Sequence, residues 1–149
     1  MRIYLDVCCL NRPFDDRTQD SVRLEAEAIL VILQNCEDED WQLVNSEIIK
    51  FEISKTPNTI RKQKATKIME LAKEYITLEE KIILKAKNIE QQGIKAIDAL
   101  HLASAEEGKV DVFLSTDKEL IKKVQKRKIM KIKVENPVKW LVEVLENDK

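Results

Sequence analysis

Four carboxylates stand out from the 27 acidic residues of this chain because of the positions they occupy. Asp6 directly follows one apolar run and Asp117 lies just past another, so both are expected at the carboxyl ends of strands. In an open parallel sheet, ligands bind in the crevice outside those strand ends. Glu52 and Asp98 instead lie among apolar residues on predicted helices, where a charge is costly unless a cation or a partner compensates it.

The two helical acids are the less expected ones. Glu52 falls near the centre of an apolar face that includes Ile48, Ile49 and Phe51, and we expect Phe51 to be buried. Asp98 lies on a segment, 94–105, whose apolar residues cover almost the whole helix circumference, as in a fully buried helix. Both patterns indicate acids that need a compensating partner.

Carboxylates are hard oxygen donors, which suit Mg²⁺ or Mn²⁺ rather than zinc. The usual work of such a cluster is hydrolysis of a phosphodiester, in which one or two metal ions activate water and stabilise the leaving oxygen. Structural roles remain open beside this one. Asp117 could interact with a helix dipole, Asp6 could begin a turn, and Asp98 could be a buried acid with a neutral partner or a lysine.

The composition excludes several other kinds of site. The chain has one histidine (His101), three cysteines without zinc-ligand spacing and only two glycines. Multi-imidazole sites, disulfide frameworks and glycine-rich phosphate loops are therefore excluded. We expect His101 to be a packed, hydrogen-bonded residue within reach of Asp98, and the cysteines to be packed thiols.

The charges nearly cancel, with 26 Lys and Arg against 27 Asp and Glu, so a nucleic-acid surface would have to be local. No apolar run approaches the roughly 18 residues of a membrane span. The chain shows no signal-peptide pattern, and a cytoplasmic location is expected.

Hydrophobic periodicity and turn residues place the elements that must position these acids. Strands are predicted at 2–5, 41–44, 110–114 and 129–134, with a polar turn at 11–16. Helices are predicted at 20–35, from 47 to about 55, and at 59–74, 79–92, 95–107 and 137–146. A further helix follows Thr116, which with Glu119 fits a capping box. This alternation predicts one α/β domain over 1–149, three-layered α/β/α, with a mostly parallel central sheet.

The order of these motifs resembles the PIN-domain nucleases, including the VapC-like toxins of toxin–antitoxin pairs. The resemblance covers essentially the whole chain, and its matching stretches are Ile3-Tyr4-Leu5-Asp6, Asn45-Ser46 with Glu52 six residues after the serine, Ile97-Asp98-Ala99-Leu100-His101-Leu102-Ala103, Val112-Phe113-Leu114-Ser115-Thr116-Asp117 and Asn136-Pro137. It implies a metal-dependent ribonuclease, commonly dimeric. Position by position, the acidic quartet of the family falls on Asp6, Glu52, Asp98 and Asp117.

The chain departs from the family pattern directly after the first aspartate. Many members carry Thr or Ser and then Asn there, whereas this chain has Val7 and Cys8. We expect Asn11, or Ser115 and Thr116, to supply the missing polar contact near the metal or substrate.

Two local groups of basic residues are candidates for holding RNA phosphates. The stretch from Lys55 to Lys67 has five basic residues and no acid, and Lys62 is its candidate phosphate contact. Lys118, Lys122 and Lys126 recur every four residues on the helix after Thr116. Solvated helix faces would show the same patterns, so we treat Lys62, Lys118 and Lys122 as candidates only.

The sequence therefore predicts an endoribonuclease that uses Mg²⁺ or Mn²⁺, either as a toxin with an antitoxin partner or on its own, and as a homodimer. A non-catalytic RNA- or protein-binding module with the same fold is the alternative. A haloacid-dehalogenase-type phosphatase is disfavoured by Cys8, where that class needs a second aspartate. A receiver domain is disfavoured because no strand in the middle of the chain ends in an acid.

Overall fold

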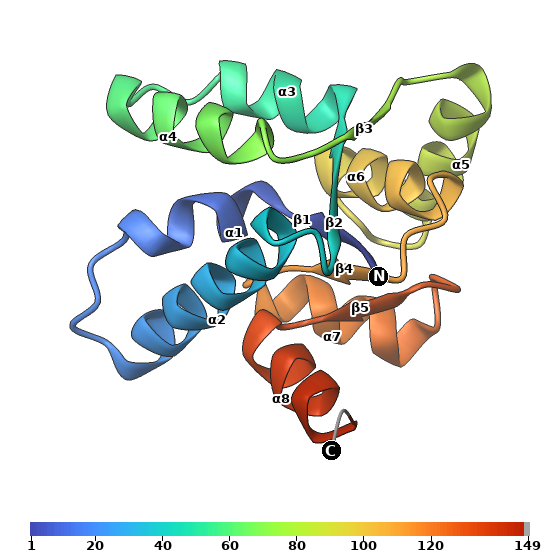
Figure 1. The fold of residues 1–149 in the computed structure, drawn as a ribbon. Helices are drawn as coiled ribbons and strands as arrows, with labels where there is room; N and C mark the ends of the chain where they lie inside the picture. The colour runs from blue at the N-terminus through green and yellow to red at the C-terminus, as the bar shows by residue number, and fades with distance from the viewer. Residues whose placement is uncertain (148–149) are drawn as a thin grey trace.

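The computed structural model describes residues 1–147, in which five strands alternate with helices (Figure 1). The strands are β1 (Arg2–Leu5), β2 (Gln42–Ser46), β3 (Glu74–Ile76), β4 (Val112–Leu114) and β5 (Lys133–Glu135). The helices are α1 (Val7–Asn11), the 3-10 turn η1 (Arg12–Phe14), α2 (Asp20–Glu37), α3 (Glu47–Ser54), α4 (Thr59–Met69), α5 (Glu80–Gln91), α6 (Ala96–Glu107), α7 (Lys118–Arg127) and α8 (Pro137–Asn147).

The sheet is parallel throughout and has the order β3-β2-β1-β4-β5. The chain runs outward from β1 through β2 to β3, then returns to place β4 on the other side of β1, with Ile3 opposite both Leu43 and Val112. The switch point of the topology is therefore the junction of β1 and β4. A receiver domain has its strands in the order 2-1-3-4-5, so this topology excludes that alternative.

Helices cover both faces of the sheet, which confirms the predicted three-layer α/β/α class. Right-handed crossovers place α2 on one face and α5, α6 and α7 on the other, because the chain reverses direction across the sheet after β3. α8 packs against α2, and α5 packs against α6 (Figure 1). None of the helices in residues 1–147 is long and apolar enough to cross a membrane.

The central strand is buried on both faces because it lies between the two helical layers. Ile3, Tyr4 and Leu5 are each 0% exposed. Phe113 of β4 stacks on Tyr4, with ring centroids 5.2 Å apart and an interplanar angle of 16°. One continuous hydrophobic core extends from this pair into both layers.

Three elements differ from the sequence prediction, of which one is the last strand: it begins at Lys133 and not at residue 129. The helix expected over 59–74 ends at Met69, and the chain then forms β3, whose Glu74 and Tyr75 are exposed. A three-residue edge strand with one half-buried residue is too short to show an alternation of apolar and polar residues. Hydrophobic periodicity therefore does not predict it. The polar turn expected at 11–16 is preceded by a short helix, α1, whose N-cap is Asp6.

The predicted capping box after β4 is also wrong. Asp117, not Thr116, is the N-cap of α7, since its Oδ1 accepts a hydrogen bond from Leu120 N at 3.1 Å. Thr116 is buried one residue earlier, with its backbone N directed at the Cys8 sulfur. The helix therefore begins one residue later than the pattern indicates.

A buried and an exposed leucine on two neighbouring helices allow a matched test of their contributions to the free energy of unfolding. Leu102 on α6 is fully buried, whereas Leu84 on α5 is 58% exposed. We expect Leu102→Ala to lower the free energy of unfolding by about 2–5 kcal/mol and Leu84→Ala to change it by less than about 0.5 kcal/mol. Urea denaturation of the two variants measures the difference, and equal losses would contradict the assignment of α6 to the core.

Candidate metal site

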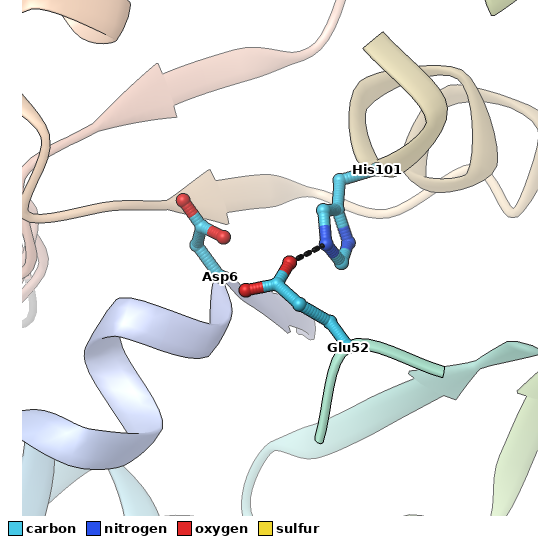
Figure 2. A group of neighbouring side chains, drawn as sticks. All are labelled: Asp6, Glu52 and His101. Carbon is cyan, nitrogen blue, oxygen red and sulfur yellow. Dashed lines mark hydrogen bonds and ion pairs between the residues drawn. The ribbon is translucent and has the colours of Figure 1, made fainter. Parts of the chain in front are cut away.

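The four predicted acids arrive at the carboxyl edge of the sheet from four separate segments. Asp6 directly follows β1, and Asp117 lies just past the end of β4, the strand beside it. Glu52 lies on α3, which begins directly after β2, and Asp98 lies in the first turn of α6. Figure 2 shows the carboxylates of Asp6 and Glu52 close together, with His101 beside them.

Asp6 is buried, with 6% exposure, and hydrogen bonds orient its carboxylate. Its Oδ1 accepts from Val7 N at 2.9 Å, and its Oδ2 accepts from Ser115 Oγ at 2.9 Å. Ser115 Oγ also accepts from Asp117 N at 3.0 Å. The Ser115 hydroxyl therefore links the first and last acids of the quartet.

Burial and mutual repulsion govern the protonation of the two more enclosed acids. Desolvation raises the pKa of Asp6 well above its ordinary value, and the neighbouring Cys8, Asp98 and Glu52 raise it further, while the Ser115 hydrogen bond lowers it. Partial burial raises the pKa of Asp98, and Asp117 and Glu52 add to this effect. The charges of these acids therefore influence one another across the carboxyl edge of the sheet.

Asp98 and Asp117 line the same cleft, about 200 Å³ in volume, between the start of α6 and the start of α7. Asp117 is exposed, and its capping bond engages one of its oxygens, so a carboxylate oxygen remains for a ligand. Asp98 is half-buried, because the first turn of α6 is more open than the sequence predicts and Ile97 is 37% exposed. The helix is fully enclosed only from His101 to Ala105.

Glu52 lies at the edge of the buried face of α3, with a side chain 34% exposed. The prediction that Phe51 is buried is wrong: Phe51 is 49% exposed. Helix α3 packs Ile48, Ile49 and Ile53 inward, and this rotates Phe51 to solvent while Glu52 faces the site.

His101 contacts Glu52, and sequence reasoning did not find this contact. The imidazole is 0% exposed, and its Nε2 lies 2.6 Å from Glu52 Oε1. Donor atoms of Asp6, Glu52 and His101 lie within 4.8 Å of one another, a spacing that could hold a metal ion. The glutamate is 49 residues away in sequence, so no local pattern could have indicated the pair.

Cys8, which stands where many members of the resembled family have a polar residue, places its thiol next to Asp6. Cys8 Sγ lies 3.5 Å from Asp6 Oδ2 and 3.6 Å from Ser115 Oγ, and Thr116 N donates to it at 3.5 Å. Hydrogen bonds with Cys9, Thr116 and Ser115 lower the pKa of the Cys8 thiol to about 5, against the opposing effect of burial. Cys8 thus makes polar contacts at the site despite its apolar character.

The residues predicted to contact substrate differ in burial and in hydrogen bonding. Ser115 and Thr116 are buried, and the Ser115 hydroxyl orients Asp6. Asn11, at the end of α1, has a buried Oδ1 without a hydrogen-bond partner in the described residues. Lys62 is exposed on α4, while Lys118 and Lys122 are exposed on α7.

Part of the basic stretch from Lys55 to Lys67 is already engaged within the protein. Arg61 donates to Asp15 Oδ1 at 2.7 Å and to the Phe14 carbonyl at 3.1 Å. Lys64 lies over the Phe14 ring at 4.5 Å. These two residues connect α4 to the segment after α1, so we do not count them as free phosphate contacts.

Comparison with known proteins identifies the family. The family model described as "PIN domain" matches residues 3–126. The chain belongs to the PIN domain family. The resemblance predicted from the motifs is thereby confirmed, and a haloacid-dehalogenase-type phosphatase is excluded. Among curated proteins, none matches this chain.

Solved structures with the same fold include toxin–antitoxin complexes. VapBC2 from Rickettsia felis, bound to a DNA fragment from their promoter, matches at a TM-score of 0.53 and 17% identity, over 91% of this chain and 98% of that chain. VapBC-1 from nontypeable Haemophilus influenzae matches at a TM-score of 0.59 and 17% identity, over 92% and 98%. At this identity the matches establish the shared fold of the PIN domain.

The donor set of this PIN domain fits a hard divalent cation. The predicted ligands are all carboxylates, and the most buried of them, Asp6, has carboxylates rather than a cationic side chain among the groups that shift its pKa. Such a cluster is destabilising without a positive charge, and Mg²⁺ or Mn²⁺ matches oxygen donors.

The raised pKa of Asp6 predicts how metal-free stability depends on pH. A raised folded-state pKa contributes stability below the unfolded-state value, and this is lost as pH rises through the folded-state value. We therefore expect Asp6→Asn to be more stable than the wild type at pH 7.5 in EDTA, with the difference shrinking as the pH falls toward 4. Thermal melts across this pH range measure it.

Asp40→Asn is the matched control, because Asp40 is exposed and precedes β2, at the opposite edge of the sheet. It should follow the wild type at every pH. An Asp6→Asn variant less stable than the wild type at pH 7.5 would show that the carboxylate is not a destabilising charge.

Proposed function

We propose that the protein is an endoribonuclease dependent on Mg²⁺ or Mn²⁺, with Asp6, Glu52, Asp98 and Asp117 as the metal-binding and catalytic residues. The observation that carries this proposal is the placement of the carboxylates at the carboxyl edge of a parallel sheet, where such folds bind ligands: donor atoms of Asp6 and Glu52 lie within 4.8 Å of each other, and Asp98 and Asp117 line one cleft. Membership of the PIN domain family supports a nuclease.

Asp6 and the pair Asp98 and Asp117 have different tasks in this proposal. Asp6 is held by Val7 N and Ser115, so it presents a fixed carboxylate from the floor of the site. Asp98 and Asp117 border the open cleft, where a phosphodiester could approach. A bound divalent cation would supply activation of water and stabilisation of the leaving oxygen. No side-chain nucleophile is required.

We further propose that the protein is the toxin of a toxin–antitoxin pair, that its partner is an antitoxin protein, and that it forms a homodimer. The support is the fold shared with the VapBC complexes, one of which is described as bound to promoter DNA. RNA is the proposed substrate, and no chemistry on DNA is proposed for this chain.

A metal titration tests the cofactor without assuming a substrate. Mn²⁺ at a hundred times its dissociation constant should stabilise the wild type by about 2.7 kcal/mol, visible as a rise in Tm. We expect Asp98→Asn to lose this rise and to lose metal-dependent RNA cleavage at least about 100-fold, since even indirect metal partners cost 10–100-fold.

Asp40→Asn, at the opposite edge of the sheet, should retain both responses. If Mn²⁺ raises the Tm of neither wild type nor Asp98→Asn, the nuclease proposal fails. The conserved fold would then serve a non-catalytic RNA- or protein-binding module, with the acids in structural roles.

The basic face of α7 lies next to the proposed centre, because Lys118 directly follows Asp117 and Lys122 lies one turn further on. We expect Lys118→Ala and Lys122→Ala, each in an Asp98→Asn background that prevents cleavage, to weaken binding of single-stranded RNA. Each should reduce the slope of log affinity against log salt by about 0.7.

Lys131→Ala is the control, since Lys131 is an exposed residue that precedes β5 at the amino edge of the sheet. Affinity measurements from low to moderate salt distinguish the variants. An unchanged slope in both α7 variants would place RNA on another face.

A further inference from the structure

A buried series of hydrogen bonds leads to Glu52 from the interior of the protein. Ser46 Oγ lies 2.8 Å from Tyr4 Oη, and Tyr4 Oη lies 2.7 Å from His101 Nδ1. His101 Nε2 then lies 2.6 Å from Glu52 Oε1 (Figure 2). Ser46, Tyr4 and His101 are each 0% exposed. None of these three residues belongs to the acidic quartet.

The donors and acceptors give this series a direction. Ser46 is the N-cap of α3, and its Oγ accepts from Ile49 N at 3.1 Å, so its own hydrogen is available to Tyr4. Tyr4 can then donate to Nδ1 of a neutral imidazole, which leaves the proton on Nε2. A carboxylate can only accept, so Nε2–H is the group that matches Glu52.

The opposite tautomer would leave polar atoms unmatched. With the proton on Nδ1, the lone pair of Nε2 would face a carboxylate oxygen at 2.6 Å. Both ring nitrogens of His101 are therefore used within the protein.

We propose that His101 is a positioning residue for Glu52 and not a metal ligand, although its Nε2 lies within the cluster that could hold a metal. Its Nε2–H, fixed by Tyr4 and Ser46, holds the Glu52 carboxylate toward Asp6. Tyr4 lies on β1, the buried strand that Asp6 directly follows, so the series fixes the separation of the two carboxylates.

The assignment determines the class of metal. A site with an imidazole ligand suits zinc and other borderline metals, whereas a site of oxygen donors alone suits Mg²⁺ and Mn²⁺. If His101 is not a ligand, the remaining candidate ligands are the carboxylates of Asp6 and Glu52, together with those of Asp98 and Asp117. All of these are oxygen donors. This consequence for the metal depends on the proposed function; the proton on Nε2 does not.

The first test uses the fact that His101 is the only histidine in the chain. In protein labelled with ¹⁵N-histidine at pH 8, long-range ¹H–¹⁵N spectra should show one protonated nitrogen, Nε2, and one unprotonated nitrogen, Nδ1. Saturating Mg²⁺ should leave Nε2 protonated. A bare Nε2, before or after Mg²⁺, would overturn the proposal.

The second test measures Mn²⁺ affinity by calorimetry in variants that keep all four carboxylates. Tyr4→Phe removes only the hydroxyl that donates to His101, and we expect it to weaken Mn²⁺ binding by about 10-fold or more, as partners of metal ligands do. Tyr75→Phe, on exposed β3, is the control. His101→Gln keeps a donor and should bind Mn²⁺ more tightly than His101→Ala.

The outcomes separate the two proposals. Unchanged Mn²⁺ affinity in Tyr4→Phe would overturn the positioning role, because Glu52 would then bind the metal equally well without the fixed imidazole. A metal-ligating histidine would also depend on that hydroxyl, so the state of Nε2 in the first test decides between positioning and ligation. If the wild type binds no Mn²⁺, the proposed nuclease function fails, while the nuclear magnetic resonance result still decides which nitrogen of His101 carries the proton.

Discussion

The burial of β1 from Ile3 to Leu5 is the constraint on which the rest of the structure depends. This strand is hydrogen-bonded to β2 on one side and to β4 on the other, and helices cover both its faces. The chain leaves it at Asp6, whose backbone N donates to Leu114 O at 2.9 Å. Asp6 is therefore held at the switch point by the sheet itself, before any side-chain contact is considered.

That placement has an energetic cost which the surrounding groups only partly offset. Asp6 loses most of its hydration, and its neighbours at the edge include other carboxylates. Hydrogen bonds from Val7 N and Ser115 Oγ orient the carboxylate but supply no full positive charge. With a total stability of about 5–15 kcal/mol for a typical domain, an uncompensated buried charge is a substantial fraction. A site with this property is better suited to a bound cation than to a structural role.

The support for Asp6 comes from a distant part of the chain. At positions where many PIN domains have small polar residues, this protein has Val7 and Cys8, and a hydroxyl reaches Asp6 from Ser115, 109 residues later. The parallel pairing of β1 with β4 makes this possible, because it brings the two strand ends side by side. The thiol of Cys8 contacts both Asp6 and Ser115.

The amino-acid sequence by itself determined the class of fold and singled out the acids of the proposed site. Apolar runs followed by Asp6 and Asp117 indicate strand ends, and Glu52 and Asp98 stand out as acids among apolar residues of the sequence, although both are partly exposed in the structure. These are local patterns, produced by backbone geometry over a few residues, and a single chain displays them directly.

Tertiary structure alone decided which residues meet. The three-residue β3, the outward rotation of Phe51 and the choice of Asp117 over Thr116 as N-cap all depend on what packs against each segment. The series from Ser46 through Tyr4 and His101 to Glu52 joins residues 42, 97 and 49 positions apart. Such contacts arise from the order of strands in the sheet. The hydrophobic periodicity of a single segment does not predict that order.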